Sequence, residues 1–552
     1  MPPALPDRLF PTLTQEQIDR IAAHGRRRAT IQGEVLVDVG DRVTSFFVVL
    51  SGVIDAVRRG EDGAEGLNAT LRTGQFSGEG SLISGRRSMA QLRVGEAGEV
   101  IELDRDHLLA LVQTDAELSE ILMRSFILRR VELIARDLGD VIVLGSAHDA
   151  GTLRVKEFLT RNGHPFHYVD LDRDPTAQEL LDRFRVTIDD VPVLICSGTT
   201  VLRNPTNPKI AGCLGFNEEI DEARVSDLLV VGAGPAGLAA AVYAASEGLD
   251  VLVLESNVPG GQAGSSSRIE NYLGFPTGIS GLELTSRAHA QAVKFGARVM
   301  VAKAVTNLAC GGGRRYTVQM EDGAHATARS IIIASGAAYR RPPLENLSTF
   351  EGAGVYYGAT AMEAQLCGGD EVAIVGGGNS AGQAAVYLAQ TASRVHMVIR
   401  GTGLAETMSR YLIRRIEENP RIVVRTRTEI VALEGDRQLE RVQWRDGQTG
   451  AVETHAIRHV FMMTGAAPNT GWLGGCVVLD DKGFVKTGPD LSHDDLQAAR
   501  WPLGRPPFLL ETSRPGVFAV GDVRAGNIKR VASAVGEGSI AVALVHQALQ
   551  HA

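Results

Sequence analysis

Hydrophobic and polar positions follow a first rhythm over residues 1–140, where short apolar runs alternate with glycine turns. The apolar runs predict strands at 35–37, 46–50 and 100–103. Apolar residues then recur at steps of three and four and predict a long helix over 117–138. The apolar face of that helix must be buried, either against these strands or against a second subunit.

The rhythm changes after residue 140. Strands at 141–144, 166–169 and 191–195 alternate with helices at 152–161 and 177–184, so residues 141–215 are expected to form a small α/β unit. Residues 216–226 are rich in acidic and polar side chains and are expected to be a linker. From Asp227 onward, two similar openings of strand, glycine turn and helix predict one larger α/β body.

The first opening has the pattern of a dinucleotide-binding site. An apolar strand at 227–231 runs into Gly232-Ala233-Gly234-Pro235-Ala236-Gly237, and a helix follows at once. Glycines at this spacing allow a tight turn, the close approach of a pyrophosphate and close helix–strand contact, with the phosphates at the helix N-terminus. A second strand ends in Glu255, roughly 20 residues past the last glycine, where a ribose-binding acid is expected.

The second opening repeats this pattern. A strand at 372–375 leads into Gly376-Gly377-Gly378-Asn379-Ser380-Ala381, followed by a helix over 382–390 and a strand over 394–399. This strand ends in Arg400, and a cation there suits a 2′-phosphate, which favours NADPH over NADH; the alternative is a surface arginine without that role. Two adjacent dinucleotide sites imply hydride transfer between a nicotinamide and a flavin.

Composition restricts the other function classes. The chain has 552 residues and a net charge of −9, so several domains are expected, and binding to nucleic acid or to anionic membranes is disfavoured. The first residues lack the layout of a signal peptide, and the most apolar stretch is broken by glycine and proline, so we expect a cytoplasmic protein. Five cysteines without a Cys-x-x-Cys pair indicate a reducing compartment rather than a disulfide framework, and no metal site is predicted.

Residues 227–552 resemble the thioredoxin-reductase branch of the pyridine-nucleotide flavoproteins. The likeness lies in Gly260-Gly261-Gln262, Ile269-Glu270-Asn271-Tyr272, Ala334-Ser335-Gly336, the return segment at 464–469, and the motif at 515–522 that ends in Gly521-Asp522. The resemblance implies FAD and NADPH as cofactors; NADH is the alternative, because only Arg400 remains of the family's phosphate-binding cations. Beyond the first glycine turn, it assigns to FAD the residues Gly261, Gln262, Asn271, Ser335, Gly521, Asp522, Arg530 and Val531.

The same resemblance implies a body of the glutathione-reductase type, with an FAD-binding domain of residues 227–340 and 466–552 split by an NAD(P)-binding domain of 341–465. The family alternates between two domain orientations, so that thiols and nicotinamide visit the flavin in turn. Here the dithiol positions fall on Ala359 and Met362, and Cys367 is alone, so a dithiol cycle is not expected. Without thiols, the domains are expected to keep the nicotinamide-facing orientation.

The sequence leaves the electron acceptor open. A small redox protein is one candidate, because thioredoxin-reductase-like ferredoxin–NADP reductases also lack the cysteine pair; oxygen and a quinone are others. No acid or base is singled out, since hydride transfer to a flavin needs positioning more than proton catalysis. Two alternatives are a cyclic-nucleotide or redox sensor with a regulatory flavin body, and thiol chemistry through Cys367 and a partner's cysteine.

The two N-terminal units also resemble known folds. Residues 141–215 are similar to a thioredoxin or glutaredoxin with Pro192 as its cis-proline, although its catalytic thiols are absent; the unit either docks a partner or merely packs. Residues 1–140 resemble a cyclic-nucleotide-binding β-roll with its helix. Its phosphate cassette corresponds to Gly78, Glu79 for a ribose hydroxyl and Arg87 for the phosphate, and loss of binding is the alternative. The long helix resembles that family's dimer helix, so a homodimer is expected.

Overall fold

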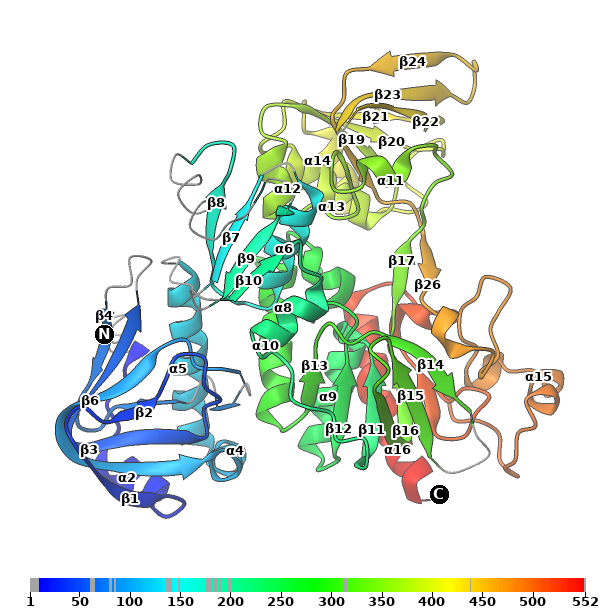
Figure 1. Ribbon diagram of the computed structural model, residues 1–552. Coiled ribbons are helices and arrows are strands. Elements are labelled where there is room, and N and C mark those ends of the chain that lie inside the picture. The colour runs from blue at the N-terminus through cyan, green and yellow to red at the C-terminus, as the bar shows by residue number, and fades with distance from the viewer. Residues whose placement is uncertain are drawn as a thin grey trace.

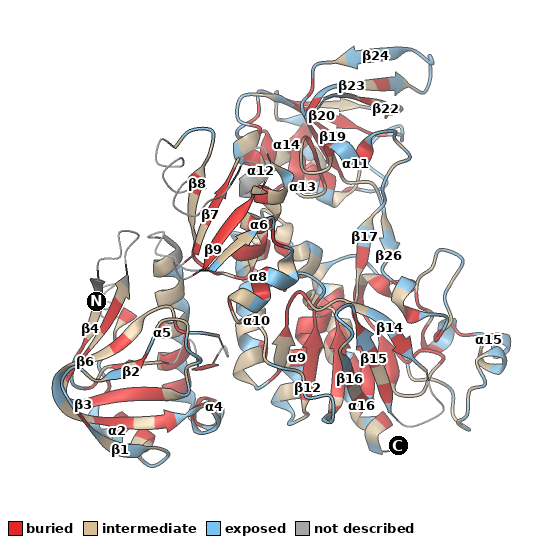
Figure 2. Cartoon of the chain, in the orientation of Figure 1, coloured by how far each residue is buried: buried red, intermediate tan, exposed pale blue. Residues whose placement is uncertain are grey.

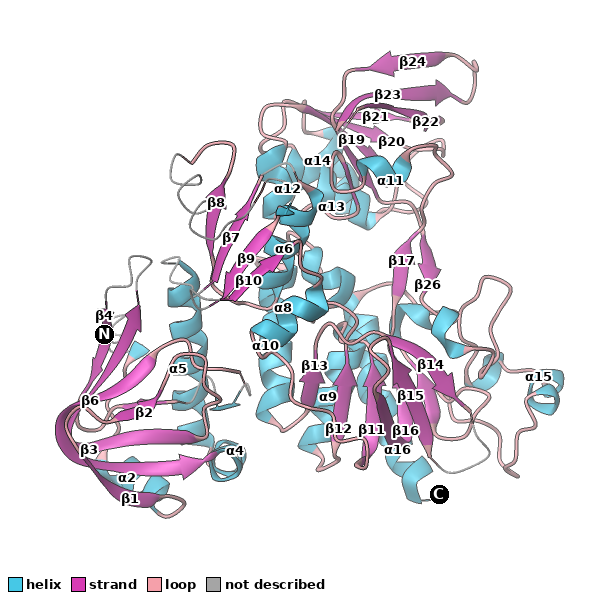
Figure 3. Ribbon diagram, viewed as in Figure 1, coloured by secondary structure: helices cyan, strands magenta, loops and turns pink. Residues whose placement is uncertain are grey.

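The computed structural model of the chain describes residues 9–550, apart from 60–64, 79–81, 84–85, 136–140, 147–148, 175–180, 182–186, 188–189, 197–199, 311–314 and 437. An N-terminal roll lies to one side, a small α/β module lies in the middle, and a body with two large sheets follows (Figures 1 and 3). Of the helices in the described part of the chain, none is long and apolar enough to cross a membrane.

The roll is a six-stranded antiparallel sheet of order β1-β6-β3-β4, with β2 on β6 and β5 on β3. Its elements are α2 (Gln15–Ala22), β1 (Arg26–Thr30), β2 (Val35–Val37), β3 (Ser45–Arg59), β4 (Glu65–Leu71), β5 (Phe76–Ser77), β6 (Gln91–Asp104), α4 (Arg105–Thr114) and α5 (Ala116–Ala135). The three strands predicted here are present. In α5, Leu118 and Leu122 pack into the core of the roll, whereas Val131 is 56% exposed. The roll itself therefore covers only the first half of the predicted apolar stripe.

The small module (residues 141–215) has a four-stranded sheet of order β10-β9-β7-β8, in which only β7 and β8 pair in parallel. Its elements are β7 (Val141–Gly145), α6 (Ala150–Arg161), β8 (His167–Asp170), β9 (Val193–Cys196), β10 (Thr200–Arg203) and α8 (Asn207–Cys213). The Val191–Pro192 peptide bond is cis, as predicted. The helix predicted over 177–184 lies almost entirely outside the described residues.

The segment 216–226 differs from the polar linker that the sequence predicted. Phe216 is buried in the core of the small module, and the Asn217 side chain exchanges two hydrogen bonds of 2.8 Å with the backbone of Val301. The first strand of the next sheet begins at Val225. Two anchoring residues among many acidic ones make this segment a fixed contact between the module and the body, and composition alone did not reveal them.

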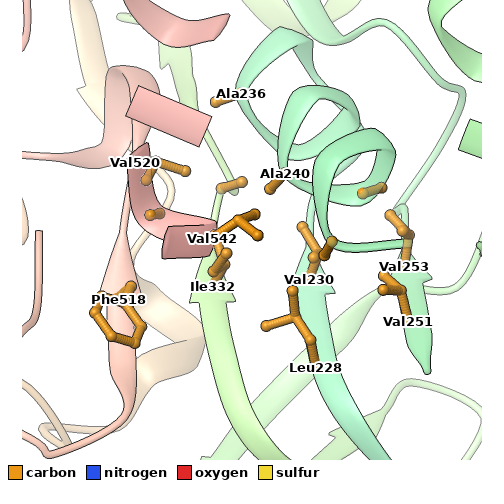
Figure 4. Packing of buried hydrophobic residues seen from close by; sticks show 14 of the residues in the cluster. Leu228, Val230, Ala236, Ala240, Val251, Val253, Ile332, Phe518, Val520 and Val542 are labelled. Atoms are coloured by element: carbon orange, nitrogen blue, oxygen red, sulfur yellow. The ribbon is translucent and has the colours of Figure 1, made fainter. Parts of the chain in front are cut away.

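The first sheet of the body has seven strands in the order β13-β12-β11-β16-β15-β14, with β27 paired to β16. Its strands are β11 (Val225–Val231), β12 (Val251–Leu254), β13 (Arg298–Met300), β14 (Val305–Ala309), β15 (Tyr316–Met320), β16 (His325–Ile333) and β27 (Val517–Ala519). Its helices include α9 (Pro235–Ser246), α10 (Gly281–Lys294) and α16 (Val531–Gln550). Figure 4 shows Val230, Ile332 and Phe518 from three strands packed with Ala240 of α9 and Val542 of α16.

The alanine-rich sequence of α9 explains this close packing, because small side chains let the two helices approach each other. A Cβ atom added at Gly538 of α16 would lie 2.3 Å from the Ala236 carbonyl oxygen of α9. Figure 2 shows that β11, β12 and β27 of this sheet are buried over nearly all of their length, whereas the edge strand β14 is largely exposed. The continuous apolar runs of the sequence follow from a sheet that is covered on both faces.

The second sheet is parallel, with five strands in the order β18-β25-β19-β20-β21. The elements of this part are α11 (Leu347–Phe350), β18 (Val355–Tyr356), α12 (Ala361–Leu366), β19 (Glu371–Val375), α13 (Asn379–Leu388), β20 (Arg394–Val398), α14 (Arg410–Glu417), β21 (Ile422–Arg425), an antiparallel trio of β22 (Thr428–Gly435), β23 (Leu439–Asp446) and β24 (Val452–His455), and β25 (His459–Met462). A two-stranded connector of β17 (Ala337–Tyr339) and β26 (Ala466–Pro468) joins it to the first sheet. The predicted domain boundaries lie beside this connector and stay a prediction.

Candidate functional site

The first glycine turn, between β11 and α9, forms a cradle that opens to one side. Gly232 has φ +104°, and a Cβ atom there would lie 2.3 Å from the Ala334 carbonyl oxygen. A Cβ atom at Gly237 would lie only 1.9 Å from the Gly232 carbonyl oxygen. Gly234 is the N-cap of α9, where Pro235 opens the helix, and a Cβ atom at Gly234 would meet nothing within 4 Å. Two glycines thus serve packing, while Gly234 leaves space before the free amides of a helix N-terminus, which favours an anion.

Glu255 follows β12 and lies beside this cradle. Its carboxylate accepts hydrogen bonds from the Ala233 amide at 2.7 Å and the Asn257 amide at 2.9 Å. The side chain is 7% exposed, and burial raises its pKa, while the two amides act in the opposite direction. The predicted ribose-binding acid is therefore fixed at the rim of the glycine turn.

A second segment, residues 260–265, lies against the same cradle. It is called the flavin segment below because the family resemblance assigns Gly261 and Gln262 to FAD. Gly261 has φ +52°, and a Cβ atom there would be 3.2 Å from the Cα atom of Gly234. The Gln262 side chain donates a hydrogen bond to the Ala337 carbonyl on the connector. The segment thus links the first glycine turn to the connector, whereas Asn271 lies farther along the chain and is exposed.

The C-terminal motif, which ends in Gly521-Asp522 shortly before α16, lies against the same cradle. Gly521 has φ +73°, and a Cβ atom there would be 2.9 Å from the Ala236 Cβ atom. Its amide donates to the Glu537 carboxylate at 2.7 Å, and Arg524 donates to the same carboxylate at 2.6 Å. Burial raises the pKa of Asp522. Sequence reasoning missed Glu537, because a single acid on a long apolar helix has no motif to mark it.

Of the other residues that the resemblance assigns to FAD, Ser335 precedes the C-terminal motif in sequence, and Arg530 and Val531 follow it. Ser335 and Asn469 exchange two hydrogen bonds: the Ser335 hydroxyl donates to the Asn469 carbonyl at 2.8 Å, and the Asn469 amide donates to the Ser335 carbonyl at 2.9 Å. These two hydrogen bonds join the two segments of the chain at the point where they enter and leave the connector. Arg530 is exposed and Val531 opens α16.

The second glycine turn, between β19 and α13, repeats the open geometry of the first. Gly376 has φ +141°, and a Cβ atom there would lie 2.4 Å from the Met463 carbonyl oxygen. Gly378 is the N-cap of α13 and faces open space, with nothing within 4 Å of an added Cβ atom. The Thr407 hydroxyl donates to the Gly377 carbonyl at 2.7 Å, and the Asn379 side chain accepts from the Ser409 amide at 2.8 Å. The helix predicted from residue 382 begins at Asn379, because the glycine turn itself forms the cap.

Arg400 follows β20 and is exposed. Burial raises the pKa of Tyr339 on the connector. The side chain of Ser380 in the second turn acts on Tyr339 and lowers this pKa, whereas the nearby carboxylate of Asp522 raises it further. Tyr339 therefore lies between the second glycine turn and the C-terminal motif, and sequence reasoning missed it because a tyrosine on a short strand has no signature.

No thiol pair lies at the dithiol position among the described residues. Ala359 is buried, and Leu153 of α6 packs against the hydrophobic cluster that contains it. A Cβ atom added at Gly352 would lie 2.7 Å from the Ala150 Cβ atom, so the start of α6 touches the same region. Cys367 is fully buried, and burial raises its pKa to about 12. A thiol with this pKa is not a nucleophile at neutral pH.

The sequence did not identify one pairing of cysteines. Cys310 and Cys476 form a disulfide with their Cα atoms 5.8 Å apart, although 166 residues separate them in sequence. Cys310 follows β14, and Cys476 lies just beyond the 3₁₀ turn Gly471–Leu473. Spacing rules detect only cysteines that are close in sequence, whereas here the sheet brings two distant ones together.

The roll contains a cavity of about 230 Å³ (the roll cavity below). Its lining is mainly apolar, but four arginines reach it: Arg86, Arg87, Arg129 and Arg130. Gly78, with φ +98°, lies at its edge, and Arg87 donates to the Gly40 carbonyl at 2.9 Å; Glu79 lies outside the described residues. The small module closes the cavity with His164, Leu214 and Phe216.

Comparisons with known proteins agree with this geometry. The family described as pyridine nucleotide-disulphide oxidoreductase matches residues 226–538, and the cyclic nucleotide-binding domain matches residues 28–115. The thioredoxin reductase of Treponema pallidum is 34% identical over 316 residues, which are 57% of this chain and 94% of that protein. The thioredoxin reductase of Mycolicibacterium smegmatis is 33% identical, over 57% of this chain and 94% of that protein.

Solved structures give the same result. The Lactococcus lactis thioredoxin reductase in its FR conformation is 27% identical, with a TM-score of 0.53 over 59% of this chain and 100% of that chain. The thioredoxin reductase of T. acidophilum is 28% identical, with a TM-score of 0.52 over 59% of this chain and 98% of that one. Together with the two family matches, these structures confirm the predicted fold class, a β-roll of the kind found in cyclic nucleotide-binding domains and a two-domain α/β body.

Proposed function

Because the chain belongs to the pyridine nucleotide-disulphide oxidoreductase family, it is an FAD-dependent NAD(P)H oxidoreductase, and we propose that it passes electrons from NADPH to an acceptor other than the disulfide of thioredoxin. The observation that carries this proposal is the replacement of the dithiol by Ala359 and Met362, with α6 packed over the region around Ala359. We also propose that the predicted site residues bind the two cofactors.

FAD, when bound, would accept a hydride from the nicotinamide and pass the electrons on. The residues of the chain fit both cofactors. Gly232, Gly234 and Gly237 would leave room for the FAD pyrophosphate at the N-terminus of α9, and Glu255 would accept from a ribose hydroxyl. Gln262, fastened to the connector, would lie beside the flavin.

The C-terminal motif and the second turn complete this assignment. Asp522, fixed by the neighbouring Gly521–Glu537 hydrogen bond, would accept from the ribityl chain. Gly376 and Gly378 would place the NADPH pyrophosphate at the N-terminus of α13, with Arg400 facing the 2′-phosphate. The role of these residues is to orient the cofactors and keep out water, since hydride transfer depends mainly on positioning.

The choice of electron acceptor follows from the missing dithiol and from the burial of the nearby thiol. A thiol relay needs two cysteines close to the flavin. Among the described residues, Cys367 is the cysteine nearest in sequence to the dithiol positions 359 and 362, and it is buried and protonated at neutral pH. The acceptor is then a small redox protein, as in a ferredoxin– or flavodoxin–NADP reductase, or a small oxidant such as a quinone or oxygen.

The test is oxidation of NADPH by the purified protein with a panel of acceptors. We expect many turnovers per flavin with an artificial dye, and no insulin reduction when thioredoxin is the sole acceptor. Arg400→Ala should raise KM for NADPH and leave KM for NADH unchanged, because the 2′-phosphate is the only difference between the two. Insulin reduction through thioredoxin at the rate of dye reduction would contradict the proposal.

We also propose that the roll cavity binds an effector, with a cyclic nucleotide as the first candidate. The family match over residues 28–115 and the position of Arg87 at the cavity support this. Calorimetric titration with cyclic AMP should show binding that Arg87→Ala abolishes; no binding by the wild-type chain would favour the alternative that the roll has lost its ligand. If the flavin body is only the regulatory part of such a sensor, dye reduction with NADPH will be absent. The cytoplasmic location and the homodimer stay predictions.

A further inference from the structure

The C-terminal turn of α6 in the small module, residues 161–163 (the α6 turn below), contacts the flavin segment. The Arg161 guanidinium donates a hydrogen bond of 2.6 Å to the Gly261 carbonyl, and a Cβ atom added at Gly264 would lie 2.9 Å from the same Nη2 atom. Arg161 is only 11% exposed, and its second amino group pairs with Glu157 one turn earlier, at 3.1 Å. The guanidinium is therefore fixed in its own helix while it touches the flavin segment at two points.

The other side of the same turn is bound by the roll. Arg86 donates to the Asn162 carbonyl at 2.8 Å, and Arg130 of α5 donates to the carbonyls of Asn162 and Gly163, both at 2.8 Å. These are the unpaired carbonyls at a helix C-terminus, which carry partial negative charge and favour cations. Burial lowers the pKa of both arginines, and no carboxylate of the described residues contributes to either shift.

Arg86 and Arg130 also line the roll cavity. A ligand in that cavity would meet the same guanidiniums that bind the α6 turn, and an anionic ligand would compete with the Asn162 and Gly163 carbonyls for their hydrogen bonds. The α6 turn thus connects the cavity with the flavin segment: the carbonyls on the cavity side and Arg161 on the flavin side belong to three consecutive residues.

We propose that the α6 turn positions the flavin segment through Arg161 and links the state of the roll cavity to flavin binding. This inference rests on the flavin site proposed above. It gives the small module a role in the reaction although it has no catalytic thiols: Arg161 is a positioning residue that acts through Gly261, and Arg86 and Arg130 set where the turn lies.

The first test measures FAD binding by the flavin-free protein, through quenching of flavin fluorescence. Arg161→Met should weaken FAD binding roughly tenfold, the effect of losing one hydrogen bond from a charged donor, and should shift the visible spectrum of the bound flavin. Arg154→Met is the matched control on the same helix, because Arg154 bonds Asn207 and the Pro205 carbonyl inside the small module. The control should bind FAD as the wild type does.

The second test measures the link to the roll. Arg130→Met should weaken FAD binding in the same direction, and this effect should disappear in the Arg161→Met background, because both changes act through one turn. Arg129→Met is the control on α5, since Arg129 bonds the Leu9 and Phe76 carbonyls within the roll. If Arg161→Met does not fold, Gly264→Ala displaces the guanidinium while it remains in the chain.

Wild-type affinity in Arg161→Met or Gly264→Ala would overturn the positioning role of Arg161. Full additivity of Arg130→Met and Arg161→Met, or equal effects of Arg130→Met and Arg129→Met, would overturn the α6 turn as the link between the roll and the flavin segment. Failure of the wild-type chain to bind FAD at all would instead refute the proposed flavin site, so the two failures are distinguishable.

Discussion

Alanine at three glycines separates the packing role of the two turns from their binding role. At Gly234 and Gly378 an added methyl group meets nothing within 4 Å, whereas at Gly237 it would lie 1.9 Å from the Gly232 carbonyl oxygen, against an ordinary contact of 3.4–4 Å. Gly234→Ala should therefore fold, at a cost below about 1 kcal/mol for a poorer N-cap. Gly237→Ala must move backbone and should cost about 1–3 kcal/mol or more.

Gly234→Ala, which should change stability little, should change FAD binding strongly. The methyl group of Gly234→Ala occupies the space in front of the α9 amides and would push a pyrophosphate away from them. Loss of two hydrogen bonds to a charged group, at about 1.5–3 kcal/mol each, corresponds to a fall in FAD affinity of roughly 10²–10⁴. Gly378→Ala should leave FAD bound and raise KM for NADPH by a similar factor, because it alters only the second cradle.

The assay combines thermal unfolding of the flavin-free proteins, flavin content after purification, and KM for NADPH. We expect native-like unfolding with little flavin for Gly234→Ala, native-like unfolding with full flavin and high KM for Gly378→Ala, and a lowered unfolding temperature for Gly237→Ala. Wild-type flavin content in Gly234→Ala, or loss of flavin in Gly378→Ala, would refute the assignment of the two cradles.

Three further outcomes are expected. Cys367→Ala should keep full turnover, because burial raises the pKa of that thiol to about 12; a loss of activity with flavin still bound would restore the thiol alternative. Double replacement of Cys310 and Cys476 by alanine should lower the unfolding free energy by about 2–4 kcal/mol in denaturant titrations, with dye reduction unchanged, and lost turnover would instead assign the pair to the electron path. Burial and the guanidiniums of Arg86 and Arg130 lower the pKa of His289 to about 3. Its neutral form is therefore favoured in the folded protein, so stability is lost as pH falls from 6.5 toward 3, at up to about 1.4 kcal/mol per pH unit, and His289→Gln should flatten thermal unfolding profiles over that range.

The two glycine turns could be predicted because their chemistry is local. Gly232 and Gly376 need positive φ directly after a strand, and the glycine spacing in a short stretch of sequence predicts this turn, although the carbonyls that approach them, those of Ala334 and Met463, come from distant segments. The ends of the elements were less exact: α13 starts at Asn379 because the turn itself caps the helix.

Contacts between distant segments could not be predicted. Glu537 reaches Gly521, Arg161 reaches Gly261, and Cys310 reaches Cys476 only after sheets and helices are in place. Each of these side chains is ordinary in its own sequence neighbourhood. The same reason explains the error at residues 216–226, where Phe216 and Asn217 acquire their anchoring role from the surfaces on which they land.

Helix α6 crosses the joint between the two large sheets of the body. Its first residues, Ala150 and Leu153, press on the second sheet's domain, and its last, Arg161, is bonded to the first. A swing of one sheet relative to the other, with the connector as hinge, would have to break one of these attachments. The small module therefore ties the two sheets together beside the connector, so that their relative orientation depends on α6 as well as on β17 and β26.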